Sequence, residues 1–223
     1  SIAKAENIPA EEVAYKISGQ IDPFHDHYSD FMLNTEKNNP SKPYPFYLCY
    51  PLENELSDIG EPIEWIAEWK WDGIRGQCVK RNNQHFIWSR GEILITSSLP
   101  EFENFFLKLP EGTVIDGEIL CADSASSDIS PQPFSLLQTR LNRKKVSSKM
   151  MQEAPVVFVA YDLLEYNGED LRQRSLSERK EMLHRIIGCT KDNYLKCSPI
   201  ISFINWSDLA EIRKYSREKG AEE

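Results

Sequence analysis

The sequence predicts an α+β fold built on antiparallel sheets that are flanked by helices. In several segments rich in β-branched and aromatic side chains, apolar and polar residues alternate, as in strands with one buried face. Other segments space their apolar residues three and four apart, as amphipathic helices do. The predicted strands outnumber the helices and are interleaved with them irregularly, which favours α+β over a regular alternation of strand and helix.

The predicted elements follow one another from residue 64 onward. Before them, residues 10–18 could form a helix, and the proline-rich residues 38–47 are typical of a linker or an extended segment. Strands are expected at residues 64–73, 74–81, 85–96, 113–121, 156–166 and 194–200. Helices are expected at residues 100–109 and 133–142, after a capping box formed by Ser175 and Glu178, and from Asn205 or Ser207 to Gly220.

Composition and charge exclude several classes of protein. The chain has 223 residues and a formal net charge of −9, which argues against a uniformly basic nucleic-acid binder but allows a local basic surface. No run of about 18 apolar residues could span a membrane, and the N-terminus has no apolar signal region. The five cysteines are odd in number and lack CxxC spacing. This pattern argues against a zinc site and a secreted disulfide framework, and favours a reducing cytosol.

The segment EWKWDGIRG, residues 68–76, is unusual because Lys70 lies between Trp69 and Trp71 in a predicted apolar strand. Burial there would disfavour the ammonium form, lower the pKa of the lysine and free its amine to act as a nucleophile. Arg75 adds a cation that could hold a phosphate bidentately. The simpler alternative is an edge lysine that keeps its amine in water, and a bare K-x-D-G motif would not exclude it.

Further motifs follow in a defined order. WSRGE (88–92) presents Arg90, VIDGE (114–118) ends in Glu118, and FVAYDLLEYNGEDLR (158–172) contains Tyr161. With PYPF-x-L and LQ-x-R, this order resembles the covalent nucleotidyltransferases, which comprise ATP-dependent DNA ligases, RNA ligases and mRNA-capping enzymes. It is most similar to bacterial ATP-dependent DNA ligases, over residues 43–187.

The resemblance implies an adenylation domain with a nucleotide cleft between its sheets, and it implies a role for each motif residue. Lys70 would attack the α-phosphate of ATP to form a lysyl-AMP, which would pass its AMP to the 5′-phosphate at a DNA nick before the 3′-hydroxyl displaces it. Glu68 would accept from the amine of adenine, and Tyr161, where the family usually has Phe, would stack on the base. Arg75 and Arg90 would hold the ribose and phosphates, and Glu118 would bind a ribose hydroxyl. The plain alternatives are an exposed Glu118, a core Tyr161 and a Glu68 paired with an arginine.

The same resemblance implies a divalent cation, Mg²⁺, which neutralises phosphate charge. In the family, a later acid in an E-G-x-x-x-K motif supports the cation, and the C-terminal sequence GAEE offers Glu223, or Glu222, for that role. We therefore expect an N-terminal segment, residues 1–40, that could be the tail of a helical DNA-binding domain, followed by a nucleotidyltransferase domain, residues 41–223. We expect the chain to be cut before the rest of that motif and before an OB-fold domain. It would then fold but bind nucleotide weakly.

A basic stretch supports a polynucleotide substrate. It places five cations in ten residues of an otherwise acidic chain: Arg140, Arg143, Lys144, Lys145 and Lys149. The functional interpretation is contact with the phosphates of nicked duplex DNA, and the alternative is a solvated basic loop. We expect a monomer with no membrane partner, in the bacterial cytoplasm at the nucleoid.

Two other functions stay open at this point. An RNA ligase or a capping guanylyltransferase would share the lysine chemistry but differ in base and acceptor. A non-catalytic module that binds nucleotides or DNA ends could keep the fold without forming a covalent adduct.

Overall fold

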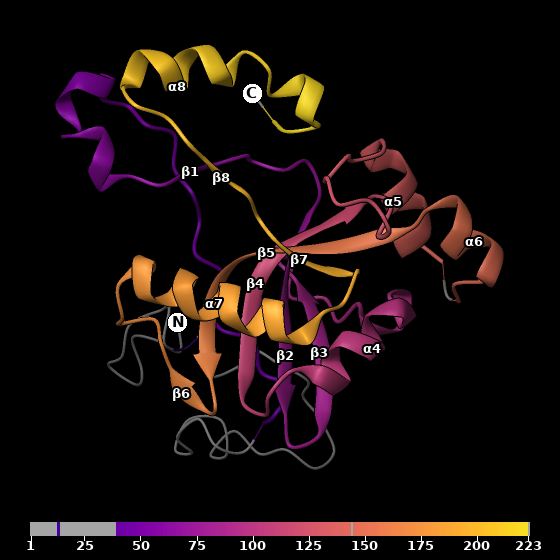
Figure 1. The fold of residues 1–223 in the computed structure, drawn as a ribbon. Helices are drawn as coiled ribbons and strands as arrows, with labels where there is room; N and C mark the ends of the chain where they lie inside the picture. Colours follow the sequence, from indigo (N-terminus) through magenta and orange to yellow (C-terminus); the bar gives the residue numbers. More distant parts are fainter. Residues whose placement is uncertain (1–12, 14–38, 144, 223) are drawn as a thin grey trace.

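The computed structural model describes Val13, residues 39–143 and residues 145–222 (Figure 1). A six-stranded sheet forms its centre, with neighbouring strands in the order β3-β2-β4-β5-β6 and with β7 beside β5. All pairs are antiparallel except β5 with β7. The strands are β2 (Ile74–Arg81), β3 (Gln84–Ser89), β4 (Thr113–Cys121), β5 (Val156–Tyr166), β6 (Glu169–Asp170) and β7 (Leu195–Cys197). The antiparallel sheet with flanking helices confirms the predicted α+β class.

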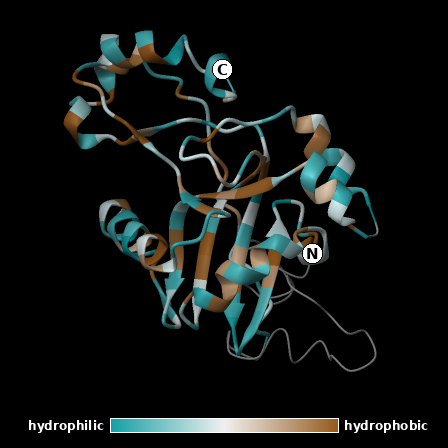
Figure 2. Cartoon of the chain, turned by 45° about the vertical axis from the view of Figure 1, so that its right-hand side comes forward, coloured by the Kyte–Doolittle hydropathy of each residue, from teal (hydrophilic) through white to brown (hydrophobic). Residues whose placement is uncertain are grey.

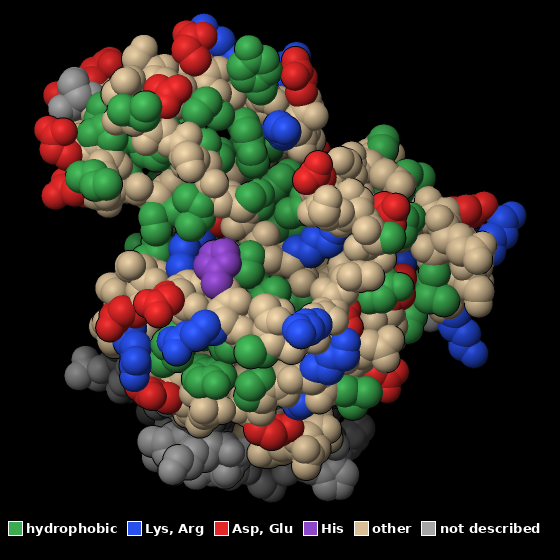
Figure 3. Space-filling view, viewed as in Figure 1, with side chains coloured by type: hydrophobic (Ala, Val, Ile, Leu, Met, Phe, Trp, Pro, Cys, Tyr) green, Lys and Arg blue, Asp and Glu red, His purple; other side chains and the backbone are tan. Residues whose placement is uncertain are grey.

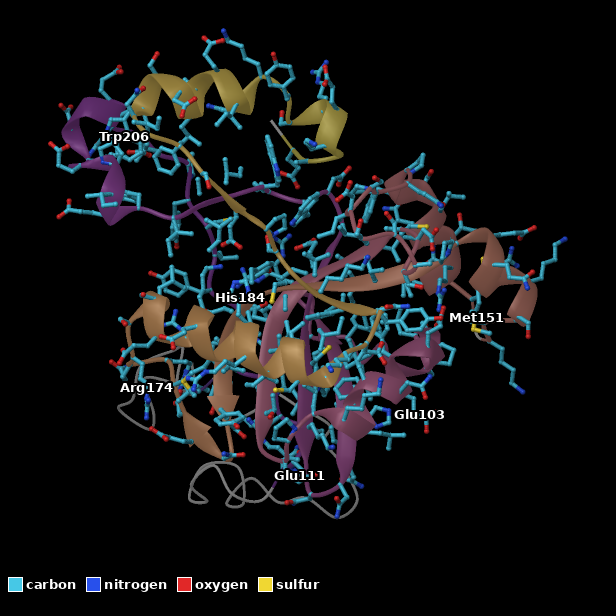
Figure 4. The ribbon with its side chains drawn as sticks, viewed as in Figure 1. Glu103, Glu111, Met151, Arg174, His184 and Trp206 are labelled. Carbon is cyan, nitrogen blue, oxygen red and sulfur yellow. The ribbon has the colours of Figure 1, made fainter. Side chains whose placement is uncertain are left out.

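A smaller lobe stands above this sheet in Figure 1 and combines distant parts of the chain. Its strands, β1 (Ala67–Glu68) and β8 (Ile200–Ile201), pair antiparallel. Trp206, labelled in Figure 4, lies against the early segment: its indole donates to the carbonyl of Gly60 at 3.1 Å, and its ring meets Trp65 edge to face. The helices of this lobe are η1 (Leu56–Asp58), η2 (Pro62–Glu64), α8 (Trp206–Arg213) and η5 (Arg217–Lys219).

The main core lies on the sheet face that packs against helices, and hydrophobic residues are frequent along the central strands (Figure 2). Ile115 and Ile119 of β4 point to this face, where Phe102 and Phe105 are fully buried. The alternation of β4 puts Asp116 and Glu118 on the opposite face, where they lie between two smaller apolar clusters that contain Val114 and Leu120. The helices on the sheet are η3 (Thr96–Ser98), η4 (Pro100–Phe102), α4 (Glu103–Lys108), α5 (Phe134–Leu141), α6 (Ser148–Glu153) and α7 (Leu176–Thr190).

Local signals explain where α7 begins and ends. Ser175 accepts from the amide of Glu178, whose side chain in turn accepts from the amide of Ser175, so the predicted capping box is confirmed. Lys191, with φ of 47°, ends the helix in the left-handed conformation. Leu183 and Ile186 then lie buried on the face toward the sheet.

The proline-rich segment is extended but is not a free linker. The amide of Tyr44 donates to Oε1 of Gln77 at 2.8 Å, and Nε2 of Gln77 donates back to the carbonyl of Tyr44 at 3.0 Å. The indole of Trp88 donates to the carbonyl of Ser41 at 2.6 Å. Residues 41–44 are buried, so this segment covers part of the sheet face that carries Asp116.

Other predicted elements differ in length from the observed ones. The strand expected at residues 64–73 is reduced to β1, because β8 offers only two partner residues. The strand expected at 194–200 is divided into β7 and β8, and the last helix ends at Arg213 instead of Gly220. Helix α6 was not predicted. The helix expected at 10–18 lies outside the described residues except for Val13, which is helical and buried. Within the described parts of the chain, no helix is long and apolar enough to cross a bilayer.

Candidate active site

Arg75 and Glu118 lie directly opposite each other on β2 and β4. Nε and Nη2 of Arg75 donate to the two carboxylate oxygens of Asp116 at 3.2 and 2.9 Å, and Nη1 donates to the carbonyl of Tyr47. Three of the five N–H groups of the guanidinium are thus engaged. Burial raises the pKa of Asp116, and the adjacent guanidinium of Arg75 opposes that rise. This fork fixes a cation beside Glu118 on the sheet face that is free of helices.

The carboxyl group of Glu118 is influenced by several of the predicted charged residues. Burial raises the pKa of its carboxyl to about 8, and the negative charge of Asp116 also raises it. The cations of Arg75, Lys70 and Arg90 act in the opposite direction. Arg90 itself is exposed just after β3, and its amide donates to the carbonyl of Arg75 at 3.0 Å. The charges of three predicted basic residues therefore act on one carboxyl group.

Lys70 is not the buried strand residue that the sequence predicted. It lies in the link between β1 and β2, and 56% of its side chain is exposed. Only one of the flanking tryptophans, Trp71, is fully in the core. The ammonium of Lys70 forms an ion pair with Glu222, and its carbonyl accepts from the amide of Glu222 at 2.7 Å. Its environment is set by a carboxylate and by solvent, so the expectation based on burial is wrong.

Gly73 explains why a glycine follows Lys70 so closely. A Cβ at this position would lie 2.4 Å from the carbonyl oxygen of Ile119 and 2.9 Å from Cγ of Glu118. The glycine thus lets the chain after Lys70 pass directly over β4. That approach is what brings Lys70 within electrostatic reach of Glu118.

Of the two acids expected to support a metal ion, the structure describes only Glu222. Glu223 lies outside the described residues, so its predicted role is not tested by the structure. Over the described residues, no group of three or more His, Cys, Asp or Glu side chains is arranged to hold a metal ion. A cation here would need oxygen ligands from elsewhere, such as the phosphates of a nucleotide, in addition to Glu222.

Glu68, on β1, has one engaged and one free carboxylate oxygen. Oε2 lies 2.5 Å from Nζ of Lys180, so the partner is a lysine and not the arginine considered from the sequence. Oε1 is buried and has no hydrogen-bond partner among the described residues. Buried polar atoms are satisfied in the great majority of cases. An unsatisfied buried acceptor therefore fits a ligand that brings its own N–H donor, such as the exocyclic amine of adenine.

Tyr161 occupies a β-bulge in β5. Opposite β4, the pairing changes register between Asp116–Asp162 and Gly117–Ala160, which leaves Tyr161 as the additional residue. Such bulges re-aim side chains. The centroid of the Tyr161 ring lies 5.8 Å from the guanidinium carbon of Arg75, and burial, followed by the charge of Asp116, raises the pKa of its hydroxyl. The ring therefore faces the charged site.

Sequence reasoning missed three residues that complete this site. Asp116 stood in the VIDGE motif, but only its Glu118 was assigned a role. Lys180 is three residues before the buried Leu183 of α7. This spacing places both side chains on one face of the helix and could have predicted that Lys180 is buried. Arg179 binds Asp162 through Nε and Nη2 at 2.8 and 3.0 Å. It thereby holds the residue next to Tyr161.

The basic stretch does not form one continuous surface. Arg140 is fully buried and donates to the carbonyls of Ser98 and Ala154 and to Glu101, so its predicted contact with DNA is wrong. Arg143 and Lys145 are exposed, and Lys144 lies outside the described residues. Basic side chains project from the end of the molecule that carries α6 (Figure 3); there, the side chain of Lys149 is 81% exposed.

A cavity of about 300 Å³ lies between the end of α4, β5 and α7. Its walls include Tyr166, Met182 and Ile186, on the side of the sheet that packs against helices. None of the predicted site residues lines it. The cavity is therefore separate from the charged residues around Glu118, which lie on the opposite face of the sheet.

Comparisons with known proteins relate this chain to DNA ligases. The family model for the ATP dependent DNA ligase domain matches residues 50–222. A probable DNA ligase of Koribacter versatilis is 37% identical over 157 residues, which are 69% of this chain and 26% of that protein. A DNA ligase of Acidianus ambivalens is 32% identical over 190 residues, which are 81% of this chain and 31% of that protein. The chain thus spans about a quarter to a third of these relatives.

Solved structures show the same fold. The ligase domain of LigD from M. tuberculosis matches with a TM-score of 0.55 at 24% identity, over 73% of this chain and 48% of that one. The Chlorella virus DNA ligase-adenylate matches with a TM-score of 0.51 at 22% identity, over 78% and 56%. The family match covers most of the chain and includes every described residue of the site. The chain belongs to the family of ATP-dependent DNA ligase domains.

Proposed function

We propose that this chain carries out the nucleotidyl-transfer chemistry of an ATP-dependent DNA ligase. The amine of Lys70 attacks the α-phosphate of ATP, a nitrogen–phosphorus bond forms, and the bond to the β-phosphate breaks with release of pyrophosphate. The AMP then passes from Lys70 to the 5′-phosphate at a nick in duplex DNA, and the 3′-hydroxyl displaces it. The observation that supports this most strongly is the position of Arg75 directly opposite Glu118, with the chain that follows Lys70 packed against Glu118 at Gly73.

Two groups at one edge of the site suit the adenine base. The unsatisfied Oε1 of Glu68 would accept from its exocyclic amine, and Tyr161 would stack on its ring. Glu118 would hydrogen-bond a ribose hydroxyl, and its raised pKa would let the carboxyl donate as well as accept near neutral pH. Arg75 has two N–H groups left after its bonds to Asp116 and Tyr47. With the exposed Arg90, it would hold the ribose and phosphates.

Glu222 would have two roles in the reaction, as a proton acceptor for Lys70 and as a ligand of the metal ion. The amine of Lys70 must lose a proton to become a nucleophile, and the carboxylate of Glu222 contacts that amine. Glu222 would also help to hold a Mg²⁺ ion bound to the phosphates, with Glu223 as the other candidate. The ion would supply neutralisation of phosphate charge at the α-phosphate.

The remaining assignments concern the macromolecular substrate. Residues 41–223 would act as the nucleotidyltransferase domain, as a monomer, on nicked duplex DNA at the bacterial nucleoid in the cytoplasm. Arg143, Lys145 and Lys149, with Lys144, would contact DNA phosphates. A net charge of −9 limits this contact, and DNA binding by the chain alone would be weak and sensitive to salt.

The test supplies the full-length protein with Mg²⁺, a nicked duplex and either ATP or GTP that carries a label on the α-phosphate. We expect label from ATP on the protein and then on the 5′ end at the nick, with none from GTP. Labelling by GTP would support the capping-type alternative, and transfer to RNA ends only would support an RNA ligase. Binding of ATP without any covalent adduct would show a non-catalytic binding module.

A further inference from the structure

Lys180 is a buried lysine that joins two parts of the candidate nucleotide site. It is 6% exposed on α7. Its Nζ lies 2.5 Å from Oε2 of Glu68 and donates to the carbonyl of Tyr161 at 3.0 Å. A buried ammonium is costly unless it is paired. Here its partners are the residue expected to recognise the amine of adenine and the residue expected to stack on the ring.

This contact gives the two oxygens of Glu68 different roles. Oε2 is held by the charge of Lys180, whereas Oε1 is buried without a hydrogen-bond partner among the described residues. The ion pair with the lysine fixes the orientation of the carboxylate. An ionised oxygen accepts hydrogen bonds and donates none. Oε1 would therefore attract the amine of adenine and repel the carbonyl oxygen that guanine has in the same place.

The neighbouring residue on α7 holds the other side of the same bulge. Arg179 binds both carboxylate oxygens of Asp162, at 2.8 and 3.0 Å, and among the described residues it forms no hydrogen bond or ion pair with Glu68. Arg179 can therefore influence the position of Tyr161 only through Asp162, the next residue of β5. Lys180 positions both Tyr161 and Glu68. The two adjacent cations allow stacking and amine recognition to be separated by experiment.

We propose that Lys180 is a positioning residue that makes the site selective for the exocyclic amine of adenine. It acts through Glu68 and does not touch the nucleotide. The proposal rests on the proposed function, because it assigns base selection within that nucleotide site.

The experiment compares ATP with purine riboside triphosphate, which lacks the exocyclic amine. We measure kcat/KM for covalent labelling of the full-length protein with each nucleotide. The wild-type protein should prefer ATP by about 10- to 100-fold, the range for a hydrogen bond to a charged group. Lys180→Met should reduce that preference to within about threefold. Lys180→Arg, which keeps the charge, should retain much of it.

Matched variants separate selectivity from stability. Arg179→Met should lower labelling by both nucleotides to the same degree and leave the preference unchanged. Lys214→Met, at an exposed lysine directly after the end of α8, should change neither rate. If Lys180→Met does not fold, as judged by thermal melting, Lys180→Gln takes its place, because it keeps an N–H donor but not the charge.

The outcomes are distinct. An unchanged preference in a folded Lys180→Met or Lys180→Gln protein would overturn the proposal, as would an equal loss of preference in Arg179→Met. If the wild-type protein forms no adduct with ATP, the proposed function fails, and the same preference is then measured by calorimetric binding of the two nucleotides. A preference that Lys180→Met abolishes in that binding assay would support the role of Lys180 independently of catalysis.

Discussion

Lys70 and Glu222 are joined twice, once through their side chains and once through the backbone. The ammonium and the carboxylate form an ion pair, and the amide of Glu222 donates to the carbonyl of Lys70 at 2.7 Å. The side chains are 56% and 47% exposed, so the ion pair should contribute at most about 1 kcal/mol to stability. The pair is therefore easily opened when a nucleotide enters, while the backbone contact keeps the carboxylate close to the amine.

Glu222→Gln should impair labelling much more than folding. The substitution removes the negative charge beside the amine, and loss of one preorganised electrostatic group typically costs about 10²–10³ in rate. The free energy of unfolding should change by less than about 1 kcal/mol. The measurements are single-turnover labelling with ATP and urea denaturation. Glu218→Gln, at a nearby exposed acid, is the control, and labelling of Glu222→Gln within threefold of the wild type would exclude a catalytic role for Glu222.

Tyr161 should contribute to ATP affinity through its ring and not through its hydroxyl. Tyr161→Phe should keep ATP affinity, whereas Tyr161→Ala should weaken it by about 1–3 kcal/mol, the scale for stacking of a base on an aromatic side chain. Calorimetric titration with ATP measures both. The control is Tyr215→Ala in the smaller lobe, where the ring is 55% exposed. Equal affinity in the wild type and Tyr161→Ala would remove Tyr161 from the nucleotide site.

The carboxyl of Glu118 should make stability depend on pH in a definite direction. Burial raises its pKa from 4.5 to about 8 in the folded protein, so between these values the folded state binds a proton that the unfolded chain has released. This contribution is complete below about pH 4.5 and is lost as the pH rises to about 8. Relative to Glu118→Gln, the wild type should lose on the order of a few kcal/mol between pH 5 and pH 8.5.

Urea denaturation of both proteins at several pH values tests this dependence. Titrating groups that do not interact with Glu118 are common to the two proteins, so their effects cancel in the difference. A difference that stays constant from pH 5 to pH 8.5, or that changes in the opposite direction, would contradict the raised pKa of Glu118.

Substitutions of Arg140 and Arg143 should have different effects, the first on stability and the second on DNA binding, although the two residues are close in sequence. Arg140→Met leaves the buried carboxylate of Glu101 unpaired and two carbonyls without donors, so it should cost about 3–5 kcal/mol of stability. Arg143→Met, at an exposed position, should change stability by less than about 0.5 kcal/mol. It should instead reduce the slope of log affinity against log salt concentration for duplex binding by about 1, as expected for the loss of one phosphate contact. Similar stability of the two variants would refute the structural role of Arg140.

The sequence predicted those features that depend on local patterns. The short segments rich in apolar residues at 113–121 and 156–166 were sufficient to predict β4 and β5, and Ser175 with Glu178 predicted the start of α7. The motif residues Arg75 and Glu118 were assigned to one site, and the structure pairs them directly. Their pairing follows from regular strands, because register fixes which side chains share a face.

The features that were missed depend on contacts between distant segments. The tryptophans around Lys70 suggested burial, but the exposure of that lysine is decided by where the link between β1 and β2 passes. Glu222 reaches Lys70 only because the smaller lobe returns to the sheet. Arg140 was treated as part of a charge cluster, although its spacing of three from the buried Leu137 already placed it on the inner side of α5.

The most direct test of the account is whether Lys70 carries the nucleotide. The full-length protein is incubated with ATP and Mg²⁺, the adduct is detected by intact-mass spectrometry, and its position is found by peptide mapping. The account predicts a covalent AMP adduct on Lys70 that is absent in Lys70→Arg, because a guanidinium stays protonated and cannot attack the phosphate. An adduct that persists in Lys70→Arg, or that maps to another residue in the wild type, would contradict it.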